Sequence, residues 1–203
     1  MYSYCMIWSL VHTKGGVAKT TTAMFLAAAA TRRGIPTRVL DADPQGSATS
    51  WAERAASVDM PLPFTVTPVT ADDLRGLTST PDELIVLDTP PGTAAAIDAA
   101  DLVIIPSGPR SADIDRVWPT LDITAHRPTT ILLTSVDLRK VEATEIPLAL
   151  ADAGAPILRT VVRARTAVER AFGRCIPRYL GDYADVFEEL TTAMAPALQE
   201  VVQ

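Results

Sequence analysis

One short loop constrains this chain more than any other feature. Residues 14–21 read Lys-Gly-Gly-Val-Ala-Lys-Thr-Thr, between an apolar strand-like run at residues 6–11 and a helix-forming run at residues 22–33. A glycine-rich loop at the start of a helix directs backbone N–H groups and the positive end of the helix dipole toward bound phosphate. Lys19 adds a positive charge for the phosphates, and Thr20 adds a hydroxyl for Mg²⁺. The pattern therefore predicts a nucleotide phosphate site on an α/β fold.

The loop also carries a second lysine, Lys14, at its start. The chain has only three lysines, and two of them lie in this loop. The doubled-lysine pattern resembles the signature of the deviant Walker ATPases of the ParA/MinD group, and most closely the ParA-type partition ATPases. The family usually has glycine where this chain has Ala18. The resemblance implies nucleotide contacts from Lys14, Gly15, Gly16, Val17, Ala18, Lys19, Thr20 and Thr21.

The resemblance also implies a chemistry. In ParA-like proteins ATP is enclosed in a homodimer, and the extra lysine reaches the phosphates of the partner subunit. Lys14 occupies that position, so it is expected to neutralise transition-state charge in trans, while Lys19 does so within its own subunit. We therefore expect a Mg²⁺-dependent ATPase that binds ATP and ADP. With ATP it would form a homodimer, and higher assemblies are left open.

A second motif follows the next apolar run. Residues 41–46 read Asp-Ala-Asp-Pro-Gln-Gly. Two carboxylates at alternate positions of a strand project on the same side, and the carboxyl ends of strands form the ligand-binding edge of an open α/β sheet. The string resembles the family's second motif, which implies that Asp43 orients or activates the attacking water and that Asp41 supports the Mg²⁺ shell. For an isolated Asp-Pro pair, a turn or helix cap is the alternative.

A third motif ends in Asp88. The run Leu84–Leu87 is continuously apolar and delivers Asp88 to the same edge, before Thr-Pro-Pro-Gly at residues 89–92. The segment resembles the Walker B strand of the family, so Asp88 is expected to hold Mg²⁺ through water and residues 90–92 to sense the γ-phosphate. The expected metal site consists of Thr20, Asp41 and Asp88.

The contact with the base is less sharply defined. Family members often have an adenine-contacting loop after the strand that here ends near Val162. By this resemblance the adenine contact falls on Val162 and Arg163. Residues 100–106 are similar to the fifth strand of the family and add no catalytic group.

All 203 residues read as a single P-loop ATPase domain, with residues 1–5 as a candidate N-terminal extension. Alternating strand and helix patterns predict a three-layer α/β fold with a mostly parallel central sheet flanked by helices. The expected strands are Ile7–His12, Thr37–Leu40, Phe64–Pro68, Leu84–Leu87, Leu102–Ile105, Thr130–Leu133 and Ile157–Val162. The expected helices are Lys19–Arg33, Ser47–Ala56, Ala71–Leu77, Ile114–Thr124, Glu142–Ala153, Thr166–Phe172 and Tyr183–Val202.

The remaining composition favours a cytoplasmic protein. No apolar run approaches the roughly 20 residues that span a bilayer. Residues 1–5 lack the positive region and cleavage site of a secretory signal. Cys5 and Cys175 form neither a disulfide framework nor a metal-binding pair. The two histidines, His12 and His126, have no partner in the motifs and are expected at surface or loop positions. The three tryptophans (Trp8, Trp51 and Trp118) are expected in the core.

Charge is distributed unevenly along the chain. The formal net charge is −6, yet residues 159–178 contain six arginines and one glutamate. A basic stripe on an acidic body can bind a polyanion locally. Arg163, Arg165, Arg170 and Arg174 are therefore expected to line one face of the ATP dimer and bind non-specific DNA. Alternatively, these arginines are solvated helix positions or intramolecular partners of the acidic body.

The leading interpretation is an ATP-dependent switch that partitions or positions DNA in plasmid or chromosome segregation. The resemblance implies that the ATP dimer binds non-specific DNA and that a small centromere-binding, ParB-like partner stimulates hydrolysis. Such a protein would be cytoplasmic and associated with the nucleoid.

Three alternatives compete with this interpretation. A MinD-like membrane role is disfavoured because residues 185–203 are acidic rather than basic, so no membrane partner is expected. A ligase similar to dethiobiotin synthetase would need a small-molecule acceptor and would not respond to DNA. Positioning of protein cargo stays open, because sequence does not separate it from DNA cargo.

Overall fold

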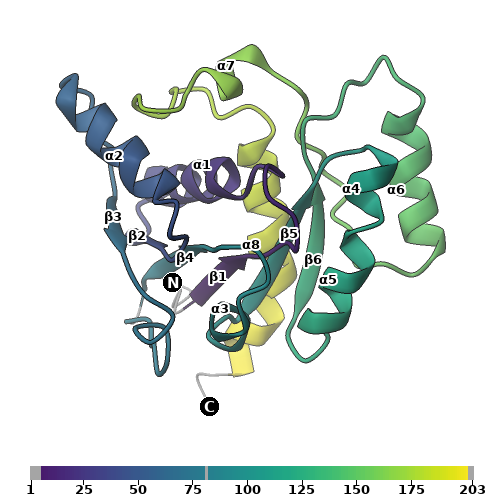
Figure 1. Ribbon diagram of the computed structural model, residues 1–203, viewed down its shortest axis with the longest axis horizontal. Coiled ribbons are helices and arrows are strands. Elements are labelled where there is room, and N and C mark those ends of the chain that lie inside the picture. Colours follow the sequence, from purple (N-terminus) through teal and green to yellow (C-terminus); the bar gives the residue numbers. More distant parts are fainter. Residues whose placement is uncertain (1–5, 81, 201–203) are drawn as a thin grey trace.

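The computed structural model describes residues 6–80 and 82–200. Within them, six parallel strands form one sheet in the order β3-β2-β4-β1-β5-β6 (Figure 1). The ends of β1, β2 and β4 are level, because Asp88 pairs in register with both Leu10 and Asp41. The strands are β1 (Met6–Leu10), β2 (Thr37–Asp41), β3 (Thr65–Pro68), β4 (Leu84–Asp88), β5 (Leu102–Ser107) and β6 (Thr129–Leu133).

Helices cover both faces of the sheet, as the predicted three-layer fold requires (Figure 1). Helices α1, α2 and α8 pack on the face that carries Trp8 and Leu10, while α3 and α5 pack on the face that carries Ile7 and Val103. The predicted fold class is therefore confirmed. The helices are α1 (Lys19–Arg32), α2 (Ser47–Ser57), α3 (Ala94–Asp98), α4 (Ser111–Ile114), α5 (Val117–Thr124), α6 (Glu142–Asp152), α7 (Thr166–Glu169) and α8 (Tyr183–Glu200).

The core is centred on α1, which packs against the sheet and beside α8 on the same face. Every residue of α1 from Thr22 to Ala30 is buried. Its alanines let the helix approach the sheet closely, while Phe25 contacts Tyr183 of α8 with ring centroids 4.8 Å apart. Trp8 and Trp51 are buried as expected, but Trp118 is 40% exposed on α5, so its assignment to the core was wrong.

The predicted strand at residues 157–162 does not form. The segment makes only two isolated bridges to the β6 region, Ile131 with Ile157 and Val136 with Arg163. The consecutive N–H groups of Arg159 and Thr160 both donate to the Glu189 carboxylate of α8. Successive N–H groups of a regular strand point in opposite directions, so this contact to α8 is incompatible with a continuous ladder.

Three predicted helices are shorter or absent. Residues 71–77 form successive turns, with i to i+3 bonds from Arg75 and Leu77 and a positive φ at Gly76. The helix predicted over residues 114–124 is broken into α4 and α5, and α5 restarts two residues before Pro119, where a missing N–H is tolerated in the first turn. The helix predicted over residues 166–172 ends at Glu169.

Two further points concern a helix that was not predicted and predicted segments that lie outside the described residues. The short helix α3, which begins after Thr93 and the Pro-Pro-Gly turn, was not predicted. The end of the last predicted helix, Val202, lies outside the described residues, as do residues 1–5. Among the described residues, no helix combines the length and apolar character needed to cross a membrane.

Candidate functional site

The three sequence motifs meet at the carboxyl ends of β1, β2 and β4. A cavity of ≈ 830 Å³ lies there, and all three motifs contribute to its lining. This is the edge at which open α/β sheets bind ligands. The lining residues from the phosphate loop are Gly15, Gly16, Ala18, Lys19, Thr20 and Thr21, and the other motifs add Asp43, Pro44, Gln45, Ser47, Pro90 and Pro91.

The phosphate loop leaves the start of α1 open toward this cavity. Gly16 and Ala18 both have positive φ, +76° and +66°, and α1 begins directly after Ala18. No side chain of the described residues caps the helix, so its first N–H groups are available to an anion. Ala18 adopts the left-handed conformation that its glycine counterpart in the family would adopt without strain.

Lys19 is buried in the wall of the cavity. It is 7% exposed, and its Nζ lies 3.4 Å from the carbonyl oxygen of Lys14. Burial lowers the pKa of Lys19, while the negative charges of Asp88 and Asp43 oppose that shift. A buried lysine with two carboxylates near it is suited to carry charge on a phosphate.

Asp88 is the buried acid of the site. It is 1% exposed, and neither carboxylate oxygen has a hydrogen-bond partner among the described residues. Burial raises the pKa of Asp88 to about 7, opposed chiefly by the neighbouring Thr20 hydroxyl. An unpaired buried carboxylate is costly, and it fits a hard cation such as Mg²⁺, which prefers oxygen ligands.

Asp41 and Asp43 have different contacts. One oxygen of Asp41 accepts the N–H and the hydroxyl of Thr49 at 2.8 and 2.7 Å, and the other accepts the N–H of Asp43 at 3.3 Å. Asp41 thus ties α2 to the end of β2. Asp43 accepts the N–H of Gln45 through one oxygen and lines the cavity. The contacts of Asp41 are structural, and its support of Mg²⁺ stays a prediction.

Lys14 does not point at the cavity of its own subunit. Its Nζ donates to Asp113 at 2.5 Å, and Asp113, on α4, is 13% exposed. The two residues are 99 positions apart, so no local pattern could have identified Asp113 as a partner. Their pairing keeps the extra lysine at the surface between the phosphate loop and α4.

Of the surface and loop positions expected for His12, it occupies a loop position after β1 and is not at the surface. His12 is fully buried, and its Nδ1 accepts the N–H of Lys14 at 2.9 Å. Burial is the largest cause that lowers the pKa of His12 to about 4, and the Lys19 charge adds to it. His126, in contrast, is 55% exposed and pairs with Asp98.

A small cavity adjoins the phosphate loop on the side of the predicted base contact. It measures ≈ 100 Å³, and its lining includes Ala18 and Thr21 together with Val162 and Arg163. Tyr183 of α8 also lines it. The structure therefore brings the two residues predicted for adenine next to the phosphate loop, and their contact with a base stays a prediction.

The predicted arginine stripe divides into two parts. Arg163 pairs with Asp182 through its backbone N–H, Nε and Nη2, and Arg165 Nε lies 3.6 Å from the same carboxylate. For this pair the intramolecular alternative holds. Arg170 and Arg174 are exposed or partly exposed and make no ion pair within residues 6–80 and 82–200. They remain candidates for a nucleic-acid surface.

The sequence reasoning missed an arginine beside this surface. Arg54 of α2 stacks over the exposed ring of Phe172, 5.4 Å from its centroid. Its side chain also lies against Gly173, between Arg170 and Arg174 in the chain. The sequence pattern of α2 could have indicated only that Arg54 lies on the polar face of an amphipathic helix. It could not have indicated that Arg54 contacts Phe172.

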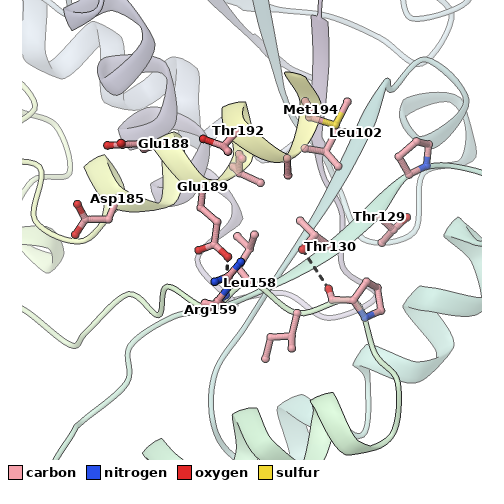
Figure 2. A pocket seen from close by; sticks show the side chains of 15 residues that line it. Leu102, Thr129, Thr130, Leu158, Arg159, Asp185, Glu188, Glu189, Thr192 and Met194 are labelled. Atoms are coloured by element: carbon pink, nitrogen blue, oxygen red, sulfur yellow. Dashed lines mark hydrogen bonds between the residues drawn. The ribbon is translucent and has the colours of Figure 1, made fainter. Parts of the chain in front are cut away.

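A second large hollow, ≈ 900 Å³, lies away from the motifs, between α8 and the start of β6 (Figure 2). Figure 2 shows Glu189 pointing from α8 toward Arg159, whose N–H it accepts at 2.7 Å. The floor is apolar, with Leu102 and Leu158 nearly buried. None of the motif residues line it, so it is separate from the candidate nucleotide site.

These features define a phosphate-binding P-loop protein, and comparison with known families gives the class. The chain matches the CobQ/CobB/MinD/ParA nucleotide binding domain over residues 8–177, and it belongs to that family. The resemblance inferred from the three motifs is thereby confirmed.

Individual relatives bear names connected with positioning and partition. The chain is 38% identical to maintenance of carboxysome distribution protein A from Gloeobacter kilaueensis, covering 93% of this chain and 95% of the relative. It is 28% identical to protein ParA from Rhizobium radiobacter, covering 79% of each. Among solved structures, the ATP complex of Cyanothece McdA superposes with a TM-score of 0.70 at 18% identity, covering 93% of this chain and 97% of that one.

Proposed function

We propose that this protein is a Mg²⁺-dependent ATPase that works as a dimerising switch and positions a cargo on DNA. The observation that carries the proposal is the buried Asp88, whose carboxylate oxygens have no hydrogen-bond partner among the described residues and which lies near Lys19 and Thr20, two residues that line the cavity of ≈ 830 Å³. A buried acid with no partner and a buried lysine complement a metal-bound triphosphate. The family match and the ATP-bound structural relative support ATP as the nucleotide.

The residues divide the chemistry among them. N–H groups of the loop and of the start of α1 would hold the phosphates, with Lys19 carrying charge. Asp88 and Thr20 fit Mg²⁺, which supplies charge neutralisation between the phosphate oxygens when bound. Asp43 would position the attacking water, while Asp41 holds Asp43 and α2 in place.

Dimerisation follows from the second lysine. In the structure the Lys14 ammonium group is held by Asp113 at the surface, and Lys14 does not line the ≈ 830 Å³ cavity of its own subunit. A lysine placed there can reach the phosphates of a second subunit and neutralise transition-state charge in trans. The proposal therefore makes the dimer depend on the triphosphate.

DNA binding is proposed for a smaller surface than the sequence alone suggested. We define the arginine surface as Arg54, Arg170 and Arg174, which have no ion pair among the described residues. Arg163 and Arg165 are left out of it because both lie against the Asp182 carboxylate, which offsets one of their two charges. Each phosphate neutralised steepens the salt dependence of binding by about 0.9 in log K per log salt.

The cargo has two candidates. DNA cargo with a ParB-like partner is the first, and the relative named ParA supports it. Protein cargo is the second, and the 38% identity to a carboxysome distribution protein favours it. Expression of a fluorescent fusion with each neighbouring gene product distinguishes them, because the partner that restores regular spacing identifies the cargo.

The central experiment is light scattering of the Asp43→Ala variant with ATP, with ADP and without nucleotide. We expect a dimer only with ATP, because the variant binds ATP without turning it over. Lys19→Ala is the matched control and should stay monomeric. An Asp43→Ala protein that binds ATP and remains a monomer at all concentrations contradicts the switch proposal.

A further inference from the structure

His12 lies directly beneath the phosphate loop and has no part in the function proposed above. Its side chain is fully buried, and its Nδ1 accepts the backbone N–H of Lys14 at 2.9 Å. Its Nε2 has no hydrogen-bond partner in the part of the chain that the structure describes. A buried polar atom without a partner calls for an explanation.

The contact with Lys14 determines the form of the ring. An imidazole nitrogen accepts a hydrogen bond only through its lone pair, so Nδ1 must be unprotonated and the proton must lie on Nε2. Three charged groups surround the ring: Lys19 and Lys14 disfavour a second proton, and Asp113 favours it. Burial in this setting keeps the ring neutral.

The same contact determines where the Lys14 side chain leaves the backbone. On one side of Lys14, Thr13 is anchored to α5, with its N–H 3.3 Å from the Thr120 hydroxyl and its own hydroxyl 3.2 Å from it. On the other side, Gly15 and Gly16 are exposed. Two contacts therefore hold the Lys14 backbone before the two exposed glycines: its N–H donates to His12 Nδ1 at 2.9 Å, and its carbonyl oxygen lies 3.4 Å from Lys19 Nζ. The His12 contact is the shorter of the two.

We propose that His12 is a positioning residue that holds the backbone of Lys14, so that its ammonium group can reach the phosphates of a partner subunit. The proposal rests on the proposed function in one respect, the action of Lys14 in trans. Because Nδ1 must keep its lone pair free for the Lys14 N–H, the ring proton stays on Nε2, although that N–H has no acceptor among the described residues. Any residue that accepts the Lys14 N–H from the same position should replace histidine.

The test compares His12→Asn with His12→Leu. The Oδ1 of asparagine occupies the place of Nδ1 and accepts a hydrogen bond, whereas leucine fills similar space without an acceptor. We expect His12→Leu to bind ATP as a monomer within about threefold of wild type but to lose about tenfold or more in kcat and in ATP-dependent dimer formation, because a displaced lysine misses its target. His12→Asn should restore both, and His126→Gln, at the exposed histidine, serves as the matched control.

A second measurement is independent of ATP. Nitrogen-15 NMR spectra of the histidine ring should show an unprotonated Nδ1 and a protonated Nε2 at neutral pH. The signals of His12 are assigned as those that disappear in the His12→Asn variant. A protonated Nδ1, or a His12→Leu protein with wild-type dimerisation and kcat, overturns the proposal. So does a His12→Asn protein as deficient as His12→Leu.

Two further outcomes separate this proposal from the proposed function and from simple misfolding. Failure of the wild-type protein itself to dimerise with ATP rejects the proposed function instead, and the spectra still decide the ring form. If His12→Leu does not fold, the proposal is tested by the ring spectra of the wild type and by whether His12→Asn keeps wild-type kcat and dimer formation.

Discussion

At the scale of single residues, the site contains two features that raise the free energy of the folded protein when no nucleotide is bound. Asp88 is buried without a hydrogen-bond partner among the described residues, and Ala18 adopts a left-handed backbone conformation with φ +66°. Left-handed backbone costs a residue with a Cβ on the order of 1 kcal/mol. These costs persist at functional sites because the surrounding structure and the ligand compensate for them.

Asp88 gives the first prediction. Its pKa is raised from 3.8 to about 7, so the folded protein holds this proton more tightly than the unfolded chain does. Its contribution to the free energy of unfolding is therefore lost as the pH rises from 3.8 to 7. We expect Asp88→Asn to raise the unfolding free energy of the nucleotide-free protein by about 1 to 4 kcal/mol at pH 8. Urea melts at pH 8 measure this change, and a variant less stable than wild type would contradict it.

The same variant should lose the stabilisation that Mg²⁺ and ATP give to the wild type.

Ala18 gives a second prediction at this scale. Ala18→Gly removes the Cβ that disfavours the left-handed conformation, at the cost of a more flexible unfolded chain. We expect a net gain in the unfolding free energy of up to about 1 kcal/mol, with ATP affinity retained. Ala23→Gly, inside the regular part of α1, is the control and should be destabilising. Equal losses of stability in both variants, measured by urea melts, would show that position 18 carries no strain.

At the scale of elements, the contacts of α8 decide what the neighbouring segments become. Glu189 binds two consecutive N–H groups and prevents a seventh strand, while Asp182, just before α8, binds Arg163 and Arg165. Both carboxylates have a lowered pKa, and for Asp182 the Arg163 contacts oppose the effect of burial. Asp182 and Glu189 thus hold the segment that leads into the predicted base-contacting loop.

Asp182 supplies the prediction for this scale. Because its pKa is depressed in the folded state, its stabilising contribution is present near neutral pH and is lost as the pH falls below its ordinary value. Asp182→Asn should lower the melting temperature at pH 7. At acidic pH the melting temperatures of the variant and the wild type should differ less. It should also weaken nucleotide binding, because the loop at Val162 and Arg163 loses its anchor. Asp185→Asn, exposed one turn further along α8, is the control and should behave as wild type.

At the scale of the whole molecule, the function depends on surfaces that face other molecules. Lys14 is paired with Asp113, so a dimer that uses Lys14 in trans must first break this pair. Such a partly exposed pair is worth about 0.2 to 1 kcal/mol. The pair therefore opposes dimerisation weakly in each subunit.

Replacing Asp113 tests this competition. Asp113→Asn should favour the ATP dimer by up to about fivefold per subunit, the factor that corresponds to about 1 kcal/mol. Analytical ultracentrifugation with ATP in the Asp43→Ala background measures the dissociation constant. The control is Asp115→Asn, which removes an exposed charge next to the same helix. If Asp113→Asn weakens the dimer, the carboxylate belongs to the interface instead.

DNA binding gives the second prediction at this scale. Replacing both Arg170 and Arg174 with alanine should weaken binding of the ATP dimer uniformly across sequences and lower the salt slope by about 0.9 for each phosphate that is no longer neutralised. Arg75→Ala removes an exposed arginine paired with Asp72 and should leave binding unchanged. Fluorescence anisotropy with random-sequence duplexes at several salt concentrations separates these outcomes. Unchanged binding in the double variant would place any DNA surface elsewhere.

The sequence by itself determined the local parts of this protein. The phosphate loop, the acids at 41, 43 and 88 and all six strands follow from residues close together in the chain, where the identity and spacing of side chains decide the backbone. The predicted fold and family followed from them. Loop conformation and strand ends depend on few neighbours, so short patterns are sufficient.

Only the tertiary structure decided the contacts between distant segments. The Lys14 and Asp113 pair joins residues 99 apart, the burial of His12 depends on packing around β1, and Arg163 and Arg165 share the carboxylate of Asp182. Residues 157–162 form no continuous strand because Glu189, in a helix some 30 residues later, binds the consecutive N–H groups of Arg159 and Thr160. The free energy of each such pair depends on the distance and orientation of its two groups. Because these groups are far apart in the sequence, only the three-dimensional fold determines which of them meet.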